Sequence, residues 1–170
     1  MTFLNRTKKP KSKARRIFTW GINLSLILLA SPLLAPQLLA FPHQRTIGDT
    51  TIYSEHPIGP NMENILKRSD ALMEKSAIYS DSYGRHIFLA QDGWRWNWLA
   101  LSVRGGVGLT RAISPNTVIV NVADLENDLT PSRGSIGKPR SISGTIAHER
   151  THQLIRGHFG VLKSFSFPTW

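Results

Sequence analysis

IAHERTHQLI, residues 146–155, is the stretch of sequence on which the interpretation of the whole chain rests. Positions four residues apart lie on the same face of an α-helix, so His148 and His152 can offer ring nitrogens to one metal ion. Glu149 lies beside them, where a carboxylate can take a proton from a water molecule that the metal has made acidic. This His-Glu-x-x-His pattern predicts a helix with a catalytic zinc site and Glu149 as general base.

The significance of the pattern depends on its surroundings. A His-Glu-x-x-His match occurs by chance in on the order of one per cent of chains of this length. Apolar residues repeat around it with a helical period, serines precede it and glycines follow it. These are Ile142, Ile146, Leu154 and Ile155 on the apolar face, Ser141 or Ser143 as N-cap, and Gly157 and Gly160 as stop. The alternative is a surface helix with solvated histidines, in which Glu149 pairs with Arg150 or Gln153.

The composition of the 170 residues, 41% of them hydrophobic, is that of one folded domain with an extension. The chain has no cysteine, which excludes a disulfide framework, a zinc ribbon and a thiol nucleophile. Its net charge of +10 is unevenly distributed, because seven positive charges lie in residues 1–16 and leave +3 for the rest. The basicity therefore belongs to a tail, and we expect no nucleic-acid partner.

The N-terminal part predicts a membrane anchor. Residues 1–16 form a basic tail, and residues 17–41 carry no charge and are long enough to span a bilayer. The basic flank predicts a single pass through the inner or plasma membrane, with the tail cytoplasmic and residues 42–170 periplasmic or extracellular. A cleaved signal peptide ending at Ala40 is the alternative and would make the domain secreted. The length of the apolar run, and Leu38 where a small residue is preferred, favour the anchor.

Between the anchor and the motif helix, the sequence predicts a small α+β domain. Short runs of β-branched and apolar residues predict strands, and one segment with a helical apolar period predicts a helix that packs against their sheet. The strands are residues 50–54, 85–90 and 116–122; the helix is residues 62–76, with Asn61 as N-cap and a Glu63–Lys67 pair. We expect the motif helix to lie across this sheet.

Two further segments precede the motif helix. The glycine-rich residues 104–109 lack the flanks of a phosphate loop, so we expect a flexible connector. If the strand at residues 116–122 lies at an edge of the sheet, its backbone can pair with an extended peptide. In the polar loop 124–135, Asp124 or Asp128 can support an imidazole N–H of the site, or lie in solvent.

The segment WRWNWLAL, residues 94–101, contains three alternating tryptophans. An extended chain would put all three on one side, whereas a helix would scatter them around its axis. Three roles are open at this point: packing in the core, contact with the nearby membrane, and a wall of a substrate site.

The motif helix and the strands that precede it resemble those of the zincin metallopeptidases, and the chain is similar to short bacterial proteins with an N-terminal anchor and one His-Glu-x-x-His helix. The resemblance implies a zincin-like fold, Zn²⁺ bound by His148 and His152, Glu149 as base, and a peptide or protein substrate. In gluzincin-like members a Pro-x-Trp turn follows, and residues 167–170 (FPTW) match it.

The third zinc ligand is not evident from the sequence. In gluzincin-like members it is a glutamate on a later helix, which here would lie beyond residue 170, so we expect a domain incomplete at its C-terminus. His158 stands where the metzincin pattern places its third histidine, but the glycine of that pattern falls at position 155, which is Ile155. An active peptidase, an inactive shortened relative and a non-enzymatic binding domain therefore remain as hypotheses.

Overall fold

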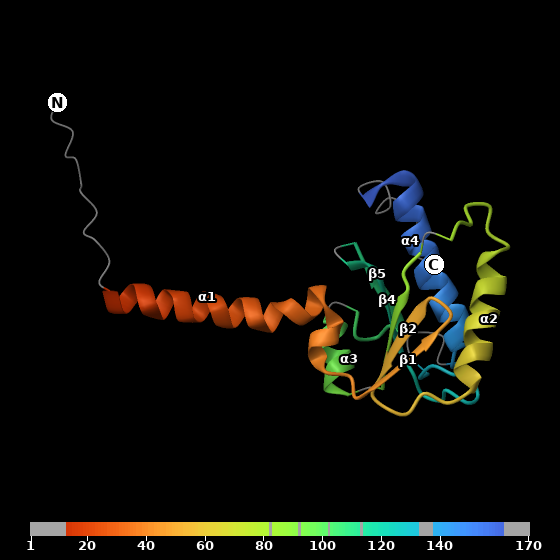
Figure 1. Ribbon diagram of the computed structural model, residues 1–170, viewed down its shortest axis with the longest axis horizontal. Helices are drawn as coiled ribbons and strands as arrows, with labels where there is room; N and C mark the ends of the chain where they lie inside the picture. The colour runs from red at the N-terminus through yellow and green to blue at the C-terminus, as the bar shows by residue number, and fades with distance from the viewer. Residues whose placement is uncertain are drawn as a thin grey trace.

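The computed structural model describes residues 13–161 apart from 82, 92, 102, 113 and 133–137. Helix α1 (Lys13–Leu34) projects from a mixed α+β domain that contains a five-stranded sheet, as Figure 1 shows. The predicted α+β class is therefore confirmed, whereas residues 167–170 lie outside the described part of the chain.

The sheet has the strand order β1-β2-β3-β5-β4. Its three central strands run parallel, and β1 and β4 are antiparallel edges. The strands are β1 (His43–Ile47), β2 (Thr50–Ser54), β3 (His86–Ala90), β4 (Gly108–Arg111) and β5 (Ser114–Asn121). The three predicted strands match β2, β3 and β5, whereas β1 and β4 were not predicted.

The strand at residues 116–122, β5, is not an edge strand, so an extended peptide cannot pair with it. β5 lies between β3 and β4, and its residues from Thr117 to Asn121 are all buried, because both faces of the sheet are covered. The edge on that side is β4, which includes Gly108 and Leu109 of the expected flexible connector.

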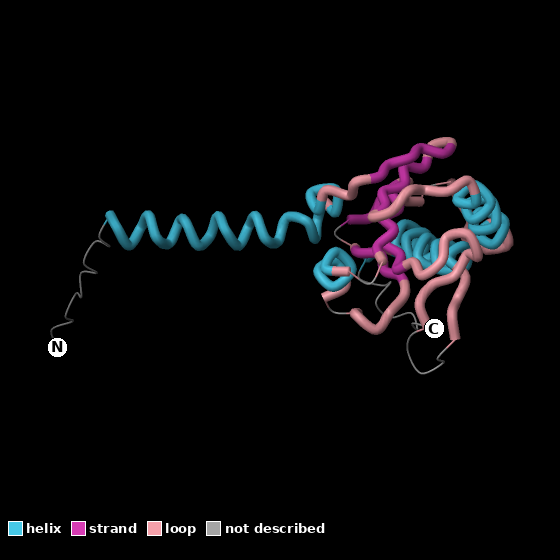
Figure 2. Tube along the Cα trace, turned by 90° about the horizontal axis from the view of Figure 1, so that it is seen from below, coloured by secondary structure: helices cyan, strands magenta, loops and turns pink. Residues whose placement is uncertain are grey.

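One face of the sheet is covered by α2 (Asn61–Met73) and α4 (Ile142–Phe159). Their apolar stripes meet the β-branched residues of the central strands in one buried cluster. Its members include Met62, Ile65, Leu66, Ile142 and Ile146 from the helices and Ile52, Ile87, Val118 and Val120 from the strands. The expected backing helix and motif helix therefore pack side by side on the same face (Figures 1 and 2).

The start of α2 differs from the prediction. Asn61 is the first helical residue, and its side-chain amide donates to the carbonyls of Leu125 and Glu126 in the loop before α4. The predicted Glu63–Lys67 pair is present at 3.0 Å.

The opposite face of the sheet is covered by the 3-10 helix η1 (Pro36–Leu39) and by α3 (Trp94–Leu99). The tryptophan segment is helical, and its three rings scatter around the axis. Trp96 is fully buried against Phe88 and Ile119, Trp98 is half-buried, and Trp94 is exposed. Core packing therefore accounts for Trp96 but leaves the exposed ring of Trp94 unexplained.

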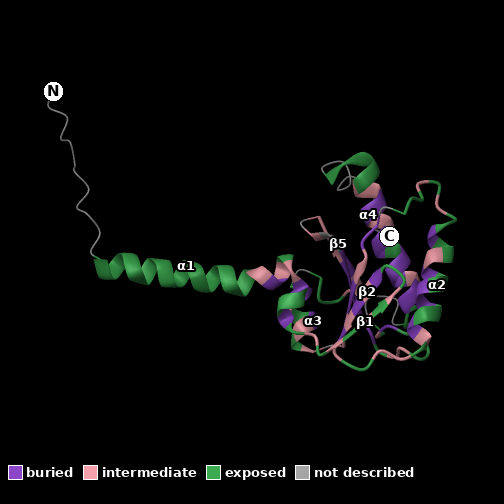
Figure 3. Cartoon of the chain, viewed as in Figure 1, coloured by how far each residue is buried: buried purple, intermediate pink, exposed green. Residues whose placement is uncertain are grey.

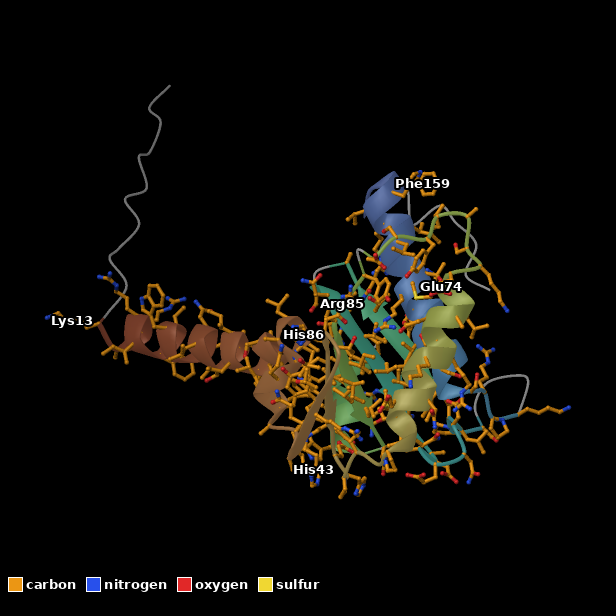
Figure 4. All side chains as sticks on the ribbon, turned by 45° about the vertical axis from the view of Figure 1, so that its right-hand side comes forward. Lys13, His43, Glu74, Arg85, His86 and Phe159 are labelled. Atoms are coloured by element: carbon orange, nitrogen blue, oxygen red, sulfur yellow. The ribbon has the colours of Figure 1, made fainter. Side chains whose placement is uncertain are left out.

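Within the described residues, α1 is the one helix long and apolar enough to cross a membrane. Its side chains are exposed along most of its length, whereas the sheet and the inner faces of the helices are buried (Figure 3). Lys13 marks its far end in Figure 4, well away from the domain.

Replacement of Ile146 by alanine tests the packing of the motif helix. Ile146 is fully buried in the cluster between the helices and the sheet, so we expect Ile146→Ala to lower the free energy of unfolding by about 2–5 kcal/mol. Urea unfolding of the full chain in detergent micelles measures this change. The exposed Leu72 on α2 is the control, and Leu72→Ala should change the free energy by less than about 0.5 kcal/mol. Equal effects would contradict the burial of Ile146 between α4 and the sheet.

Candidate metal centre

The N-terminus of α4 is held by two side chains. Ser141 is the N-cap, as predicted, and its hydroxyl accepts a hydrogen bond from the Gly144 N–H at 3.1 Å. The carboxylate of Asp128 accepts from the backbone N–H of Ser143 at 2.8 Å and from its hydroxyl at 2.6 Å. Asp128 therefore positions the helix rather than an imidazole, which was one of the roles considered for it.

Asp124, the other loop carboxylate, is used within its own turn. It accepts hydrogen bonds from the backbone N–H groups of Glu126 and Asn127. The Asn127 side chain also donates to Asp124 and is the main cause of the lowered pKa of this carboxyl group, and the two backbone N–H groups lower it further.

His148 and His152 lie one helical turn apart with their ring nitrogens close together. The two Nε2 atoms are 3.1 Å apart, and the rings meet edge to face with centroids 4.7 Å apart. Two bonds of about 2.0–2.1 Å to a tetrahedral zinc ion place their nitrogens roughly 3.3 Å apart. The pair therefore fits two positions of such an ion, and without a metal one ring can donate its proton to the other.

The surroundings favour the neutral form of both imidazoles, which is the form that binds metals. Partial burial lowers the pKa of His148, and the nearby charge of Arg140 lowers it further. Burial also lowers the pKa of His152, with smaller contributions from His148 and Arg156.

Glu149 is buried, with 7% of its surface exposed. Burial raises the pKa of Glu149 to about 7, although the charge of Arg156 and a hydrogen bond from the Thr110 backbone oppose the shift. A carboxyl group with a pKa near neutrality can both accept and return a proton, which suits a general base. Arg150 and Gln153, the partners in the surface-helix alternative, bond elsewhere, so neither of them pairs with Glu149.

A cavity of about 400 Å³ lies between β4 and the first half of α4. It is lined by Gly106, Val107 and Gly108 on the strand side and by Arg140, Ser141, Gly144, Thr145, His148 and Glu149 on the helix side. A Cβ atom at Gly108 would lie 2.5 Å from Cγ2 of Thr145 and 3.0 Å from Oε1 of Glu149. Only glycine allows this close approach of strand and helix.

The inner face of α4 carries two buried polar side chains, Arg150 and Gln153, which were considered above only as partners of Glu149 on a surface helix. Arg150 is 1% exposed, donates to Asp70 at 2.7 Å and lies over the ring of Tyr83. Gln153 accepts from the Gly84 N–H at 2.7 Å and donates to the Thr117 carbonyl at 3.0 Å. Together they fix how α4 is rotated against the sheet. The sequence indicated the burial of Arg150, because this residue lies on the apolar stripe, four residues from Ile146 and from Leu154.

Among the described residues, no group of three histidine, cysteine or acidic side chains gathers as a metal site. α4 continues through Phe159, so His158 is turned about 240° from His152. It lines a separate hollow beside Leu154 and residues 77–80 and contacts the ring of Phe159, which Figure 4 labels at the end of α4. The structure thus brings His148 and His152 together, places Glu149 with His148 in the wall of the cavity, and places His158 apart from them.

Comparisons of the chain with protein-family models, curated proteins and solved structures find no match.

Replacement of Gly108 by alanine tests the contact between β4 and α4. The added methyl group would clash with Thr145 and press on Glu149, so we expect Gly108→Ala to lower the free energy of unfolding by about 1–3 kcal/mol. Urea unfolding of the full chain measures the effect. Gly105 is the matched control, because a methyl group added there would have no atom within 4 Å and neither glycine has a positive φ. A Gly105→Ala variant that is equally destabilised would contradict a steric cause.

Proposed function

We propose that this chain is a membrane-anchored, zinc-dependent peptidase or related amide hydrolase with a zincin-like domain. The observation that carries the proposal is the 3.1 Å separation of the two Nε2 atoms, with the buried Glu149 beside His148 in the lining of the cavity. His148 and His152 are the proposed metal ligands, and Glu149 is the proposed general base.

The residues of the candidate site have distinct roles in this reaction. His148 and His152 would hold a zinc ion, whose Lewis acidity would lower the pKa of water and polarise a carbonyl group. Glu149 removes the proton from the attacking water and returns it to the leaving amine. The raised pKa of about 7 supports both transfers near neutral pH.

The outer edge of β4 supports the binding of an extended peptide. The carbonyl of Val107 accepts from the Asn121 N–H on the β5 side, and backbone groups alternate in direction along an antiparallel strand. Gly108 therefore presents its N–H and C=O on the other side, where it lines the cavity with Glu149. A substrate backbone can pair there by strand addition. In this proposal β4 takes the peptide-pairing role that residues 116–122 would have had at an edge of the sheet.

The anchor determines where such a hydrolase acts. α1 follows a basic tail, and this order of charges places the N-terminus in the cytoplasm and the domain in the periplasm or outside the cell. Retention of α1 makes the protein a single-pass protein of the inner or plasma membrane, and its removal as a signal peptide makes the domain secreted.

A second candidate is a domain that binds metal or a partner without hydrolysis. The observation that favours it is that only two ligands gather among the described residues, whereas a catalytic zinc site has three protein ligands and an open position. Zinc binding without hydrolysis would support this candidate.

Zinc content tests the metal site. We expect the full chain in micelles, after chelation and reloading, to hold about one zinc ion, as measured by mass spectrometry of the metal. His148→Ala and His152→Ala should each weaken zinc binding by more than about tenfold, since loss even of an outer partner of a ligand costs about 10–100-fold. His158, exposed on the same helix, is the control. Zinc loss in His158→Ala, or full retention after both other replacements, would exclude the proposed ligands.

Hydrolysis of a mixture of internally quenched peptides tests the role of Glu149. We expect Glu149→Gln to keep its zinc and its fold, because the amide oxygen can still accept from the Thr110 backbone. The rate should fall by about 10²–10⁴-fold, the usual contribution of a general base. Unchanged activity in this variant would exclude Glu149 as the base, and a zinc-loaded wild-type chain that cleaves nothing would favour the second candidate.

A further inference from the structure

Exposed apolar side chains surround the place where α1 joins the domain. We call this group the collar; it consists of Leu34, Leu38, Trp94, Leu101 and Val103, each between 43% and 61% exposed. α1 contacts α3, and both views show α3 and η1 on the side of the domain that faces α1 (Figures 1 and 2). The collar residues therefore cluster at the base of the anchor.

The anchor and the collar are joined rigidly. Nε of Arg95 donates to the Leu39 carbonyl at 2.9 Å and Nη2 donates to the Ala40 carbonyl at 3.0 Å. Arg111 donates to the carbonyl of Leu33 at 3.0 Å and also to that of Leu99, which links the last turn of α1 to the last turn of α3. Leu39 itself is buried in the cluster that contains Trp96.

The length of α1 gives the depth of the collar. Its 22 residues rise about 33 Å at 1.5 Å each, and the hydrocarbon core of a bilayer is about 30 Å thick. With the basic residues from Lys13 to Arg16 at one surface, Leu34 reaches the boundary of the hydrocarbon at the other surface. Leu38 and Trp94 then lie at the level of the lipid headgroups, where tryptophan is enriched.

The charge of the neighbouring segment also fits a lipid surface. Of the three arginines in residues 93–111, Arg95 pairs with Glu55 and Arg111 donates to backbone carbonyls, whereas Arg104 is exposed next to Val103. Arginine next to exposed apolar side chains is the combination that binds anionic bilayers at their interface.

We infer that the collar lies in the headgroup region of the bilayer, so that the domain rests on the membrane instead of extending away from it on a tether. The cavity wall formed by Gly106–Gly108 begins three residues after Val103. The candidate metal site is then held close to the lipid, and if the chain acts as proposed above, its substrates are polypeptide segments at the membrane surface.

Single cysteines introduced into the full chain test this inference, because the sequence contains no other cysteine. Leu101→Cys and Leu72→Cys are a matched pair, since the two leucines are 48% and 46% exposed and Leu72 lies on α2, across the sheet from α3. Each variant is labelled with a fluorophore and placed in nanodiscs that contain an anionic lipid and a lipid with a nitroxide near its headgroup. Val103→Cys provides a second position in the collar.

We expect the nitroxide lipid to quench the label at positions 101 and 103 and to leave the label at position 72 bright. Equal fluorescence at all three positions would overturn the inference. Protection of positions 101 and 103 from aqueous iodide without quenching by lipid would also overturn it, because the collar would then be covered by protein. The measurement involves neither zinc nor hydrolysis, so its outcome is independent of the proposed enzymatic activity.

Discussion

The rotation of α4 about its axis depends on the buried contacts of Arg150 and Gln153. The guanidinium of Arg150 lies between the Asp70 carboxylate and the ring of Tyr83. Burial lowers the pKa of Arg150, and Asp70 and Tyr83 act against the shift. A buried charge left without its partner costs about 3–5 kcal/mol, so this contact strongly disfavours other rotations of the helix. Each residue of an α-helix is turned about 100° from the last, and the inner position of Arg150 therefore directs Glu149 toward β4.

The sequence was sufficient to predict the elements whose burial follows a simple period. β2, β3 and β5 were visible as β-branched runs, and α2 and α4 as amphipathic helices with plausible ends. β1 and β4 were missed for different physical reasons. β1 alternates between half-buried and exposed residues and has no buried face, whereas β4 is short and begins with a glycine that is required only because a helix lies against it. That requirement is a tertiary contact and leaves no local pattern.

The sequence left open whether residues 116–122 lie at an edge of the sheet. A continuous apolar run such as Val118–Val120 indicates a strand that is covered on both faces, which places it inside a sheet rather than at its edge. The proximity of His148 and His152 was predictable, because residues four positions apart lie on the same face of a helix. The burial of Glu149 was not predictable, since it depends on an approach of β4 so close that a Cβ atom at Gly108 would lie 3.0 Å from Oε1 of Glu149.

β4 links the candidate site to the anchor. Gly108, at its start, lines the cavity beside Glu149, and Arg111, at its end, bonds to the carbonyl of Leu33 in α1. The strand has four residues, so the two contacts are separated by about 10 Å of extended backbone that is paired to β5. Such a short, paired segment cannot bend independently at its two ends. A change in the tilt of α1 therefore acts on the same strand that closes the cavity, and the orientation of the cavity relative to α1 is a property of the fold rather than of a flexible linker.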